Sequence, residues 1–200
     1  MKNMPAMQVS NYTRVCSRIL IGIGLVSFIS CMALAQTAGG GLELSLIQEA
    51  SPAHFRAELR NAGVQAVVLN LGMMLGNGRE QYANKVHVLL TGAHGEHLNL
   101  EMMLPPTING RVDTMVMPLP PGATFTLPID LRNYIAPQEK VWDLALPAGR
   151  YTLTAEYKGE GVSHIPANGD TALMPFWIGD LTSPELAFTL TEKMEGRATQ

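Results

Sequence analysis

One stretch, residues 55–72, places the strongest constraint on how this chain folds, because its pattern fits strands better than helices. Phe55, Ala57 and Leu59 alternate with charged residues, which is the period-2 pattern of a half-buried strand. The sequence Asn-Ala-Gly at 61–63 tolerates positive φ and lets the chain reverse. A second run, 64–71, is rich in β-branched and aliphatic residues and predicts a more deeply buried strand. We therefore expect this pair of strands to form the centre of a β-sandwich.

Short strand patterns also fill the rest of the chain, separated by turns rich in Gly and Pro. We expect residues 73–84 and 159–184 to be long loops, and we find no amphipathic helix of useful length. The pattern predicts an all-β fold, an antiparallel sandwich of about 8–10 strands. The other predicted strands are 42–46, 85–91, 97–102, 113–119, 123–131, 141–146, 150–158 and 185–190.

The first 35 residues have the features of a signal peptide. Positive residues precede an apolar run at 19–35, which ends in the small-x-small pattern Ala33-Leu34-Ala35. We expect cleavage before Gln36, which makes the protein exported, periplasmic or extracellular. Two alternatives remain open: an uncleaved membrane anchor, since the apolar run is near the short limit for a span, and lipidation at Cys31.

This signal defines the expected organisation of the chain. We expect a signal peptide at 1–35, a flexible spacer at 36–41, one sandwich domain at 42–192 and a frayed tail at 193–200. After cleavage we expect no insertion into a membrane.

Charge and cysteine content exclude several function classes. All 17 acidic residues follow the leader, and this acidity argues against nucleic acid and anionic membrane surfaces as partners. Both cysteines, Cys16 and Cys31, lie in the leader, so the mature domain has no disulfide, zinc–thiolate site or cysteine nucleophile. No serine lies in a G-x-S-x-G elbow, and no phosphate-binding glycine loop is present. We therefore expect neither enzymatic activity nor a bound cofactor.

The order of motifs resembles that of a known architecture. LRNAG, LNLG, a strand pair, LPPGATFTLPIDL and LPAGRYTLTAEY follow one another between residues 42 and 190. This order resembles the immunoglobulin-like sandwiches of uncharacterised exported bacterial proteins, and the layout is similar to proteinase-inhibitor domains of the BsuPI type. The resemblance implies an immunoglobulin-like fold and, as an alternative function, a proteinase inhibitor that presents a long loop. It also places Tyr151 where such folds have a corner tyrosine, whose hydroxyl caps a nearby backbone group.

Three histidines near a predicted hairpin are candidate metal ligands. His94 and His97 lie at its tip, and His87 lies on the strand that leads into it. If the hairpin is tight, His87 and His97 approach each other across the two strands. With Glu96 they would form an imidazole–carboxylate site, which suggests a periplasmic carrier of copper or zinc. The alternative is a polar hairpin with solvated side chains.

An apolar segment within the second long loop is the most informative irregular feature. It contains Met174, Phe176 and Trp177, and the apolar pair Met73 and Met74 lies in the first long loop. These five residues are our candidates for binding an unidentified protein partner. The alternative is that the segment folds back to cap an open end of the sandwich. The expected function is therefore a non-enzymatic interaction or accessory module.

Overall fold

The structure, a computed structural model, describes residues 41–104, 108–162 and 174–196. These residues form strands and one short 3-10 turn, so the all-β prediction is confirmed. The predicted signal peptide lies outside the described residues, as does the predicted spacer except for Gly41. The strands are β1 (Leu42–Gln48), β2 (His54–Asn61), β3 (Val67–Leu75), β4 (Gln81–Tyr82), β5 (Val86–Gly92), β6 (His97–Met102), β7 (Val112–Leu119), β8 (Thr124–Asp130), β9 (Tyr134–Ile135), β10 (Gly149–Gly159), β11 (Gly179–Thr182) and β12 (Leu186–Leu190), with the 3-10 turn η1 at Leu131–Asn133.

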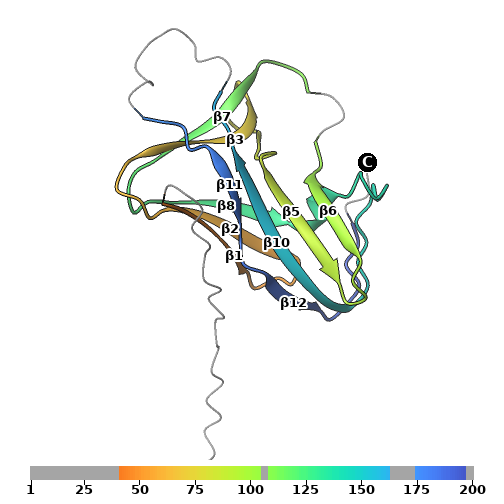
Figure 1. Cartoon of the computed structure of the whole chain (residues 1–200). Coiled ribbons are helices and arrows are strands. Elements are labelled where there is room, and N and C mark those ends of the chain that lie inside the picture. Colours follow the sequence, from red (N-terminus) through yellow and green to blue (C-terminus); the bar gives the residue numbers. More distant parts are fainter. Residues whose placement is uncertain (1–40, 105–107, 163–173, 197–200) are drawn as a thin grey trace, which may run out of the picture. The chain divides into compact units, whose positions relative to one another are not determined.

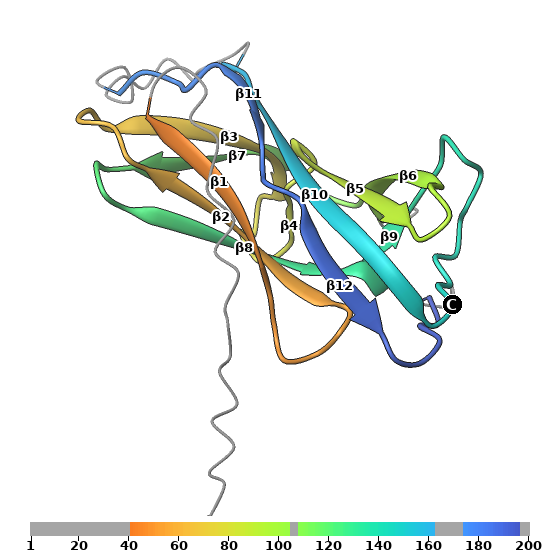
Figure 2. The same ribbon diagram turned by 60° about the horizontal axis from the view of Figure 1, so that its bottom comes forward.

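The strands form three antiparallel sheets (Figures 1 and 2). The largest has the order β11-β10-β5-β6-β9, and β12 also pairs with β10. The other two have the orders β1-β2-β8 and β4-β3-β7. One cluster of buried apolar side chains draws on all three sheets. Among the described residues, no helix is long and apolar enough to cross a membrane.

The predicted alternation places the core correctly. Leu42, Leu44 and Leu46 of β1 are buried, and so are Phe55, Ala57 and Leu59 on one face of β2. Removing one such side chain from water stabilises the fold by about 1.5–3 kcal/mol. The charged residues between them lie on the opposite, solvated face of the β1-β2-β8 sheet.

The prediction that the two runs around residue 61 pair with each other is wrong. β2 pairs with β1 and β8, whereas β3 pairs with β7 and β4. Segments 54–75 and 112–130 therefore run side by side as one ribbon that passes from one sheet into another. Asn61, 1% exposed, lies at this corner and directs its side chain to backbone groups of both segments. These contacts turn the chain out of the sheet instead of reversing it, and Val64 is left 92% exposed.

The prediction that residues 73–84 form one long loop is also wrong, because β3 contains a β-bulge and continues beyond it. The register with β7 shifts between Asn70 and Gly72, which leaves Leu71 as an extra residue. Gly72 has φ +136, and a Cβ there would overlap the Asn84 side chain. β3 continues to Leu75 and returns through β4, so residues 73–84 form a hairpin and not one long loop. The extra residue also shifts the alternation, so Met74 packs against the core.

Two further segments differ from expectation. Residues 141–146, predicted as a strand, make only isolated bridges, between Ala136 and Val141 and between Leu146 and Met194. Residues 179–182, predicted as part of a long loop, form β11, which pairs with the end of β10.

Candidate functional site

The apolar segment at 174–178 folds back onto β3. The Val68 backbone N–H donates to the Pro175 carbonyl oxygen at 2.9 Å, and the Trp177 N–H donates to the Val68 carbonyl oxygen at 2.9 Å. The Trp177 indole is 4% exposed and stacks on Tyr157, with ring centroids 5.6 Å apart. An exposed Trp177 is therefore a wrong prediction, because this large ring gains more by packing on Tyr157 than by remaining in water. Of the alternative, in which the segment folds back to cap an open end of the sandwich, the folding back is confirmed.

The other four candidates for a partner surface are half-buried. Met174 and Phe176 both precede the buried tryptophan in the chain, and Met74 packs against the core. Met73 lies opposite Thr114 of β7 and lines a cavity described below. Pro175 and Ile178 of the apolar segment are exposed, and Ile178 is 72% exposed.

The histidine hairpin does not bring its histidines together. In the β5–β6 register Thr91 lies opposite His97, and Thr91 Oγ1 is 3.0 Å from His97 Nδ1. His87 instead lies opposite Glu156 of β10. The expected approach of His87 to His97 is wrong, because the connection at 92–96 places His97 across from residue 91. His94 is exposed at the tip, and the described residues contain no group of three or more His, Cys, Asp or Glu side chains placed to hold a metal ion.

Tyr151 has the structural role expected of it. Its hydroxyl donates a hydrogen bond to the Pro147 carbonyl oxygen at 2.9 Å, so it caps a backbone group four residues earlier. Its ring stacks on Phe188 with centroids 5.6 Å apart. Burial raises the pKa of the Tyr151 hydroxyl, and the charge of Glu96 raises it further. The prediction that this hydroxyl caps a nearby backbone group is therefore confirmed.

A cavity of about 410 Å³ lies beside the bulge in β3. Its walls come from β3, from the connection between β4 and β5, from β7 and from the residues that follow β10. Five of its residues belong to the two segments expected to form binding loops, and the other four were not predicted. The interior glycine at 72 was the one signal in the sequence for this bulge. The cavity is lined by Asn70, Gly72, Met73, Asn84, Lys85, Thr114, Glu160, Gly161 and Val162.

Hydrogen bonds to neighbouring groups hold Asn70 in place at this cavity. Asn70 is 7% exposed, and its Oδ1 accepts a hydrogen bond from the Gly72 N–H at 3.3 Å. Its Nδ2 reaches the Gly161 carbonyl oxygen only at 3.5 Å, which is long for a hydrogen bond. The Tyr157 hydroxyl donates to the Asn70 carbonyl oxygen at 3.2 Å. Asn70 therefore has donor capacity left for a ligand.

An ion pair adds charge of both signs to the cavity. Lys85 Nζ and Glu160 Oε2 are 2.8 Å apart. The hydrogen bond from Lys85, together with its charge, lowers the pKa of Glu160. With Thr114 and two amide side chains, the pair offers both donors and acceptors beside the apolar Met73 and Val162.

A second depression, of about 610 Å³, lies on the six-stranded sheet. Its polar side chains are Arg150, Tyr151 and the three threonines Thr91, Thr152 and Thr189. Its lining residues include no pair of opposite charges, and the hydroxyl of its buried Tyr151 already donates to the Pro147 carbonyl oxygen. For this reason we regard the smaller cavity as the better candidate site.

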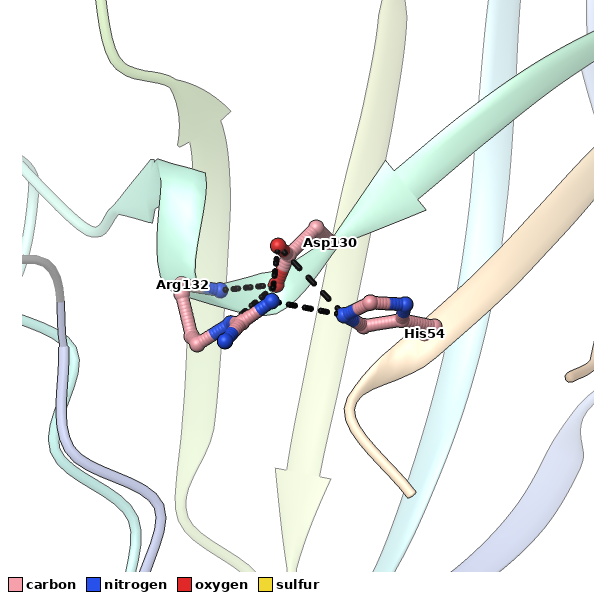
Figure 3. Close-up of polar contacts among 3 residues, drawn as sticks. All are labelled: His54, Asp130 and Arg132. Carbon is pink, nitrogen blue, oxygen red and sulfur yellow. Dashed lines mark hydrogen bonds and ion pairs between the residues drawn. The ribbon is translucent and has the colours of Figure 1, made fainter. Parts of the chain in front are cut away.

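His54, Asp130 and Arg132 form a polar cluster that the sequence analysis did not identify (Figure 3). His54 and Asp130 are directly opposite in the β2–β8 register, with Nε2 and Oδ2 3.5 Å apart. Arg132, in η1, donates from Nε to Asp130 Oδ1 at 2.8 Å and from Nη2 to Asp130 Oδ2 at 2.6 Å, and its Nη2 lies 2.7 Å from His54 Nε2.

Hydrogen bonds and ion pairs join the three side chains of this cluster. Partial burial raises the pKa of Asp130, but the hydrogen bonds and charge of Arg132 outweigh that effect and hold this pKa below its usual value. Arginine only donates hydrogen bonds, so His54 Nε2 accepts from Arg132. The cluster therefore ties the start of β2 to the end of β8.

The fold and the cavity define a class, an all-β sandwich with one small polar cavity at a strand bulge. Comparisons with protein-family models, with curated proteins and with solved structures found no match to this chain.

Proposed function

We propose that this chain is an exported, non-enzymatic binding module whose site is the cavity beside the β3 bulge. The observation that carries this proposal is the combination, in one cavity of about 410 Å³, of buried Asn70 with the Lys85–Glu160 pair. Binding sites are concave and orient their ligands through a few convergent polar groups. Bulges also occur preferentially where a strand presents side chains for function.

The chemistry of the lining favours binding over catalysis. The described lining holds no imidazole, thiol or serine hydroxyl, and its lysine and glutamate neutralise each other. The one carboxylate among the lining residues that could activate the Thr114 hydroxyl is Glu160, which is already paired with Lys85. Export is supported by the basic leader and apolar run of residues 1–35.

The donors and acceptors indicate the kind of partner. Asn70 and Asn84 offer amides, and the ion pair offers one cation and one anion. A polar side chain of a protein partner fits this set better than an apolar anchor. The described residues add no observation that favours the proteinase inhibitor or the metal carrier.

An NMR titration tests this proposal. The probes are capped amino acids, the N-acetyl amides of Gln, Ser, Lys and Glu, added to the ¹⁵N-labelled full chain. We expect saturable shifts at Asn70, Gly72, Asn84 and Lys85 with at least one probe, because these residues line the cavity.

A matched pair of variants controls the titration. Lys85→Met removes the ion pair of the cavity, whereas Lys193→Met removes a pair outside the cavity, with Glu195, whose Nζ–Oε1 distance is 2.7 Å. We expect Lys85→Met to weaken binding at least tenfold and Lys193→Met to leave it unchanged. Shifts confined to other parts of the domain, or equal binding by both variants, would show that the cavity is not the site.

A further inference from the structure

The β7 strand has one edge without a partner in the described part of the chain. It pairs with β3 on one side, and no described strand pairs with the other side (Figure 2). An open edge presents unpaired N–H and C=O groups and is a template for a further strand.

Two observations establish which residues of β7 present these groups. The Arg111 carbonyl oxygen accepts the Gly76 N–H at 2.7 Å, so the backbone of residue 111 points toward β3. Direction alternates along a strand, so Val112, Thr114 and Val116 point outward. Pro118, which has no N–H, occupies the next outward position. Val112 and Val116 are 47% and 40% exposed, so this edge is also apolar.

The edge of β8 continues that of β7 but is protected. The Leu131 N–H donates to the Ala53 carbonyl oxygen, so the backbone groups of residue 130 and of alternate residues before it point outward. Pro128 is one of these residues and interrupts the row of donors. Residues 112–117 are therefore the proline-free part of β7, and they carry no lysine to block pairing.

We propose that the free edge of β7 pairs with the same edge of a second copy of this chain, in an antiparallel ladder about a two-fold axis at Thr114. This register places Val112 opposite the partner's Val116 and Thr114 opposite the partner's Thr114. It also places Gly110 opposite the partner's Pro118. Gly110 has φ +119 and has already left the extended conformation, so the missing N–H of proline falls where the ladder ends. In this register the proline of one chain lies opposite the non-extended glycine of the other, so neither interrupts the ladder within 112–116. For this reason a second copy fits better than an unrelated peptide.

Charge is compatible with this pairing. Arg111 Nε is 2.7 Å from Asp113 Oδ1, so the two charges at the start of the edge neutralise each other within one chain. The register sets Asp113 opposite the partner's Met115, and no like charges face each other directly. An acidic chain of net charge −3 thus meets its copy at a locally neutral edge.

Two matched proline variants of the full chain test the proposal. Val116→Pro and Thr126→Pro each place a proline two residues before an existing outward proline, the first on β7 and the second on β8. Neither removes a donor from the ladders with β3 or β2, and unchanged far-ultraviolet circular dichroism and melting temperature verify that each variant folds. Light scattering gives the molar mass over an about hundredfold range of concentration, since dimers dissociate on dilution.

We expect a concentration-dependent dimer for the parent and for Thr126→Pro, and a monomer for Val116→Pro. If the apolar leader caused the association, all three proteins would associate equally, because neither substitution changes the leader. A dimer that survives in Val116→Pro, or a parent that is monomeric throughout, overturns the proposal. So does a monomeric parent whose β7 amides shift on addition of an extended peptide, because that result assigns the edge to another partner. This experiment measures molar mass, whereas the cavity titration measures NMR shifts. Failure of the dimer proposal is therefore distinguishable from failure of the cavity proposal.

Discussion

The Asn61 side-chain nitrogen donates a hydrogen bond to the Leu119 carbonyl oxygen, 2.9 Å away, although 58 residues separate them in the chain. The same nitrogen donates to the Gln65 carbonyl oxygen at 2.8 Å, and Asn61 Oδ1 accepts from the Gly63 N–H at 3.0 Å. One buried amide therefore joins the two corners at which the ribbon passes between sheets.

Replacing this amide is expected to be costly. Asn61→Ala should lower the free energy of unfolding by about 2–4 kcal/mol, because it leaves a buried carbonyl group without its donor. Urea denaturation measures the change. The control is Asn77→Ala, which removes an exposed bond to the Arg79 N–H and should cost less than about 0.5 kcal/mol. Equal losses in the two variants would contradict the role assigned to the corner.

An added methyl group should destabilise the domain at one of the two glycines beside Glu160 and should be tolerated at the other. A Cβ at Gly159 would overlap the Trp177 ring, whereas a Cβ at Gly161 would meet nothing within 4 Å. We expect Gly159→Ala to destabilise the domain by about 1–3 kcal/mol through overpacking. Gly161→Ala should change stability by less than about 1 kcal/mol. Thermal denaturation of both variants checks this, and a stable Gly159→Ala would show that Trp177 is not packed there.

Stability should decline at alkaline pH through a buried tyrosine. Burial raises the pKa of Tyr157 to about 12, from 10.0 for an ordinary tyrosine. Between these values the unfolded chain loses its proton first, so the folded state binds more protons and the free energy of unfolding falls as pH rises. Below pH 10 this contribution is fully present. Tyr157→Phe should make the decline shallower. Tyr82→Phe should do so to a smaller extent, because burial and Glu80 also raise the pKa of this half-buried tyrosine. Denaturation at a series of pH values measures it.

The His54 cluster predicts a proton position. Because Arg132 Nη2 donates to Nε2 of His54, the neutral ring should carry its proton on Nδ1. The ¹⁵N shifts of the two ring nitrogens report this directly. Arg132→Ala should release the preference, and Arg150→Ala, on another sheet, should preserve it. A parent ring protonated on Nε2 would be incompatible with the observed contact.

Alternation predicted what a local pattern can determine. The faces of β1, β2 and β10 follow it, because the side-chain period of a strand depends on that strand alone. Pairing does not. Asn-Ala-Gly at 61–63 suits a hairpin and a corner equally, and only the distant Leu119 carbonyl distinguishes them.

The candidate site was predicted only in part, for the same reason. Met73 and residues 160–162 were within the expected loops, but Asn70 and Thr114 enter the cavity through pairing across a bulge. The composition of 174–178 could not distinguish a core segment from a surface, because that depends on whether Tyr157 lies beneath Trp177. The separation of His87 and His97 depends on the register that follows from one loop length.

The ribbon has a consequence for biosynthesis. β1 and β2 form a local hairpin and can pair as soon as they are made, but β2 and β3 must wait for β8 and β7. At about 5–20 residues per second, translation of the 58 residues between Asn61 and Leu119 takes several seconds. During that interval one side of each strand remains open, so this is the period in which a nascent chain most needs a chaperone.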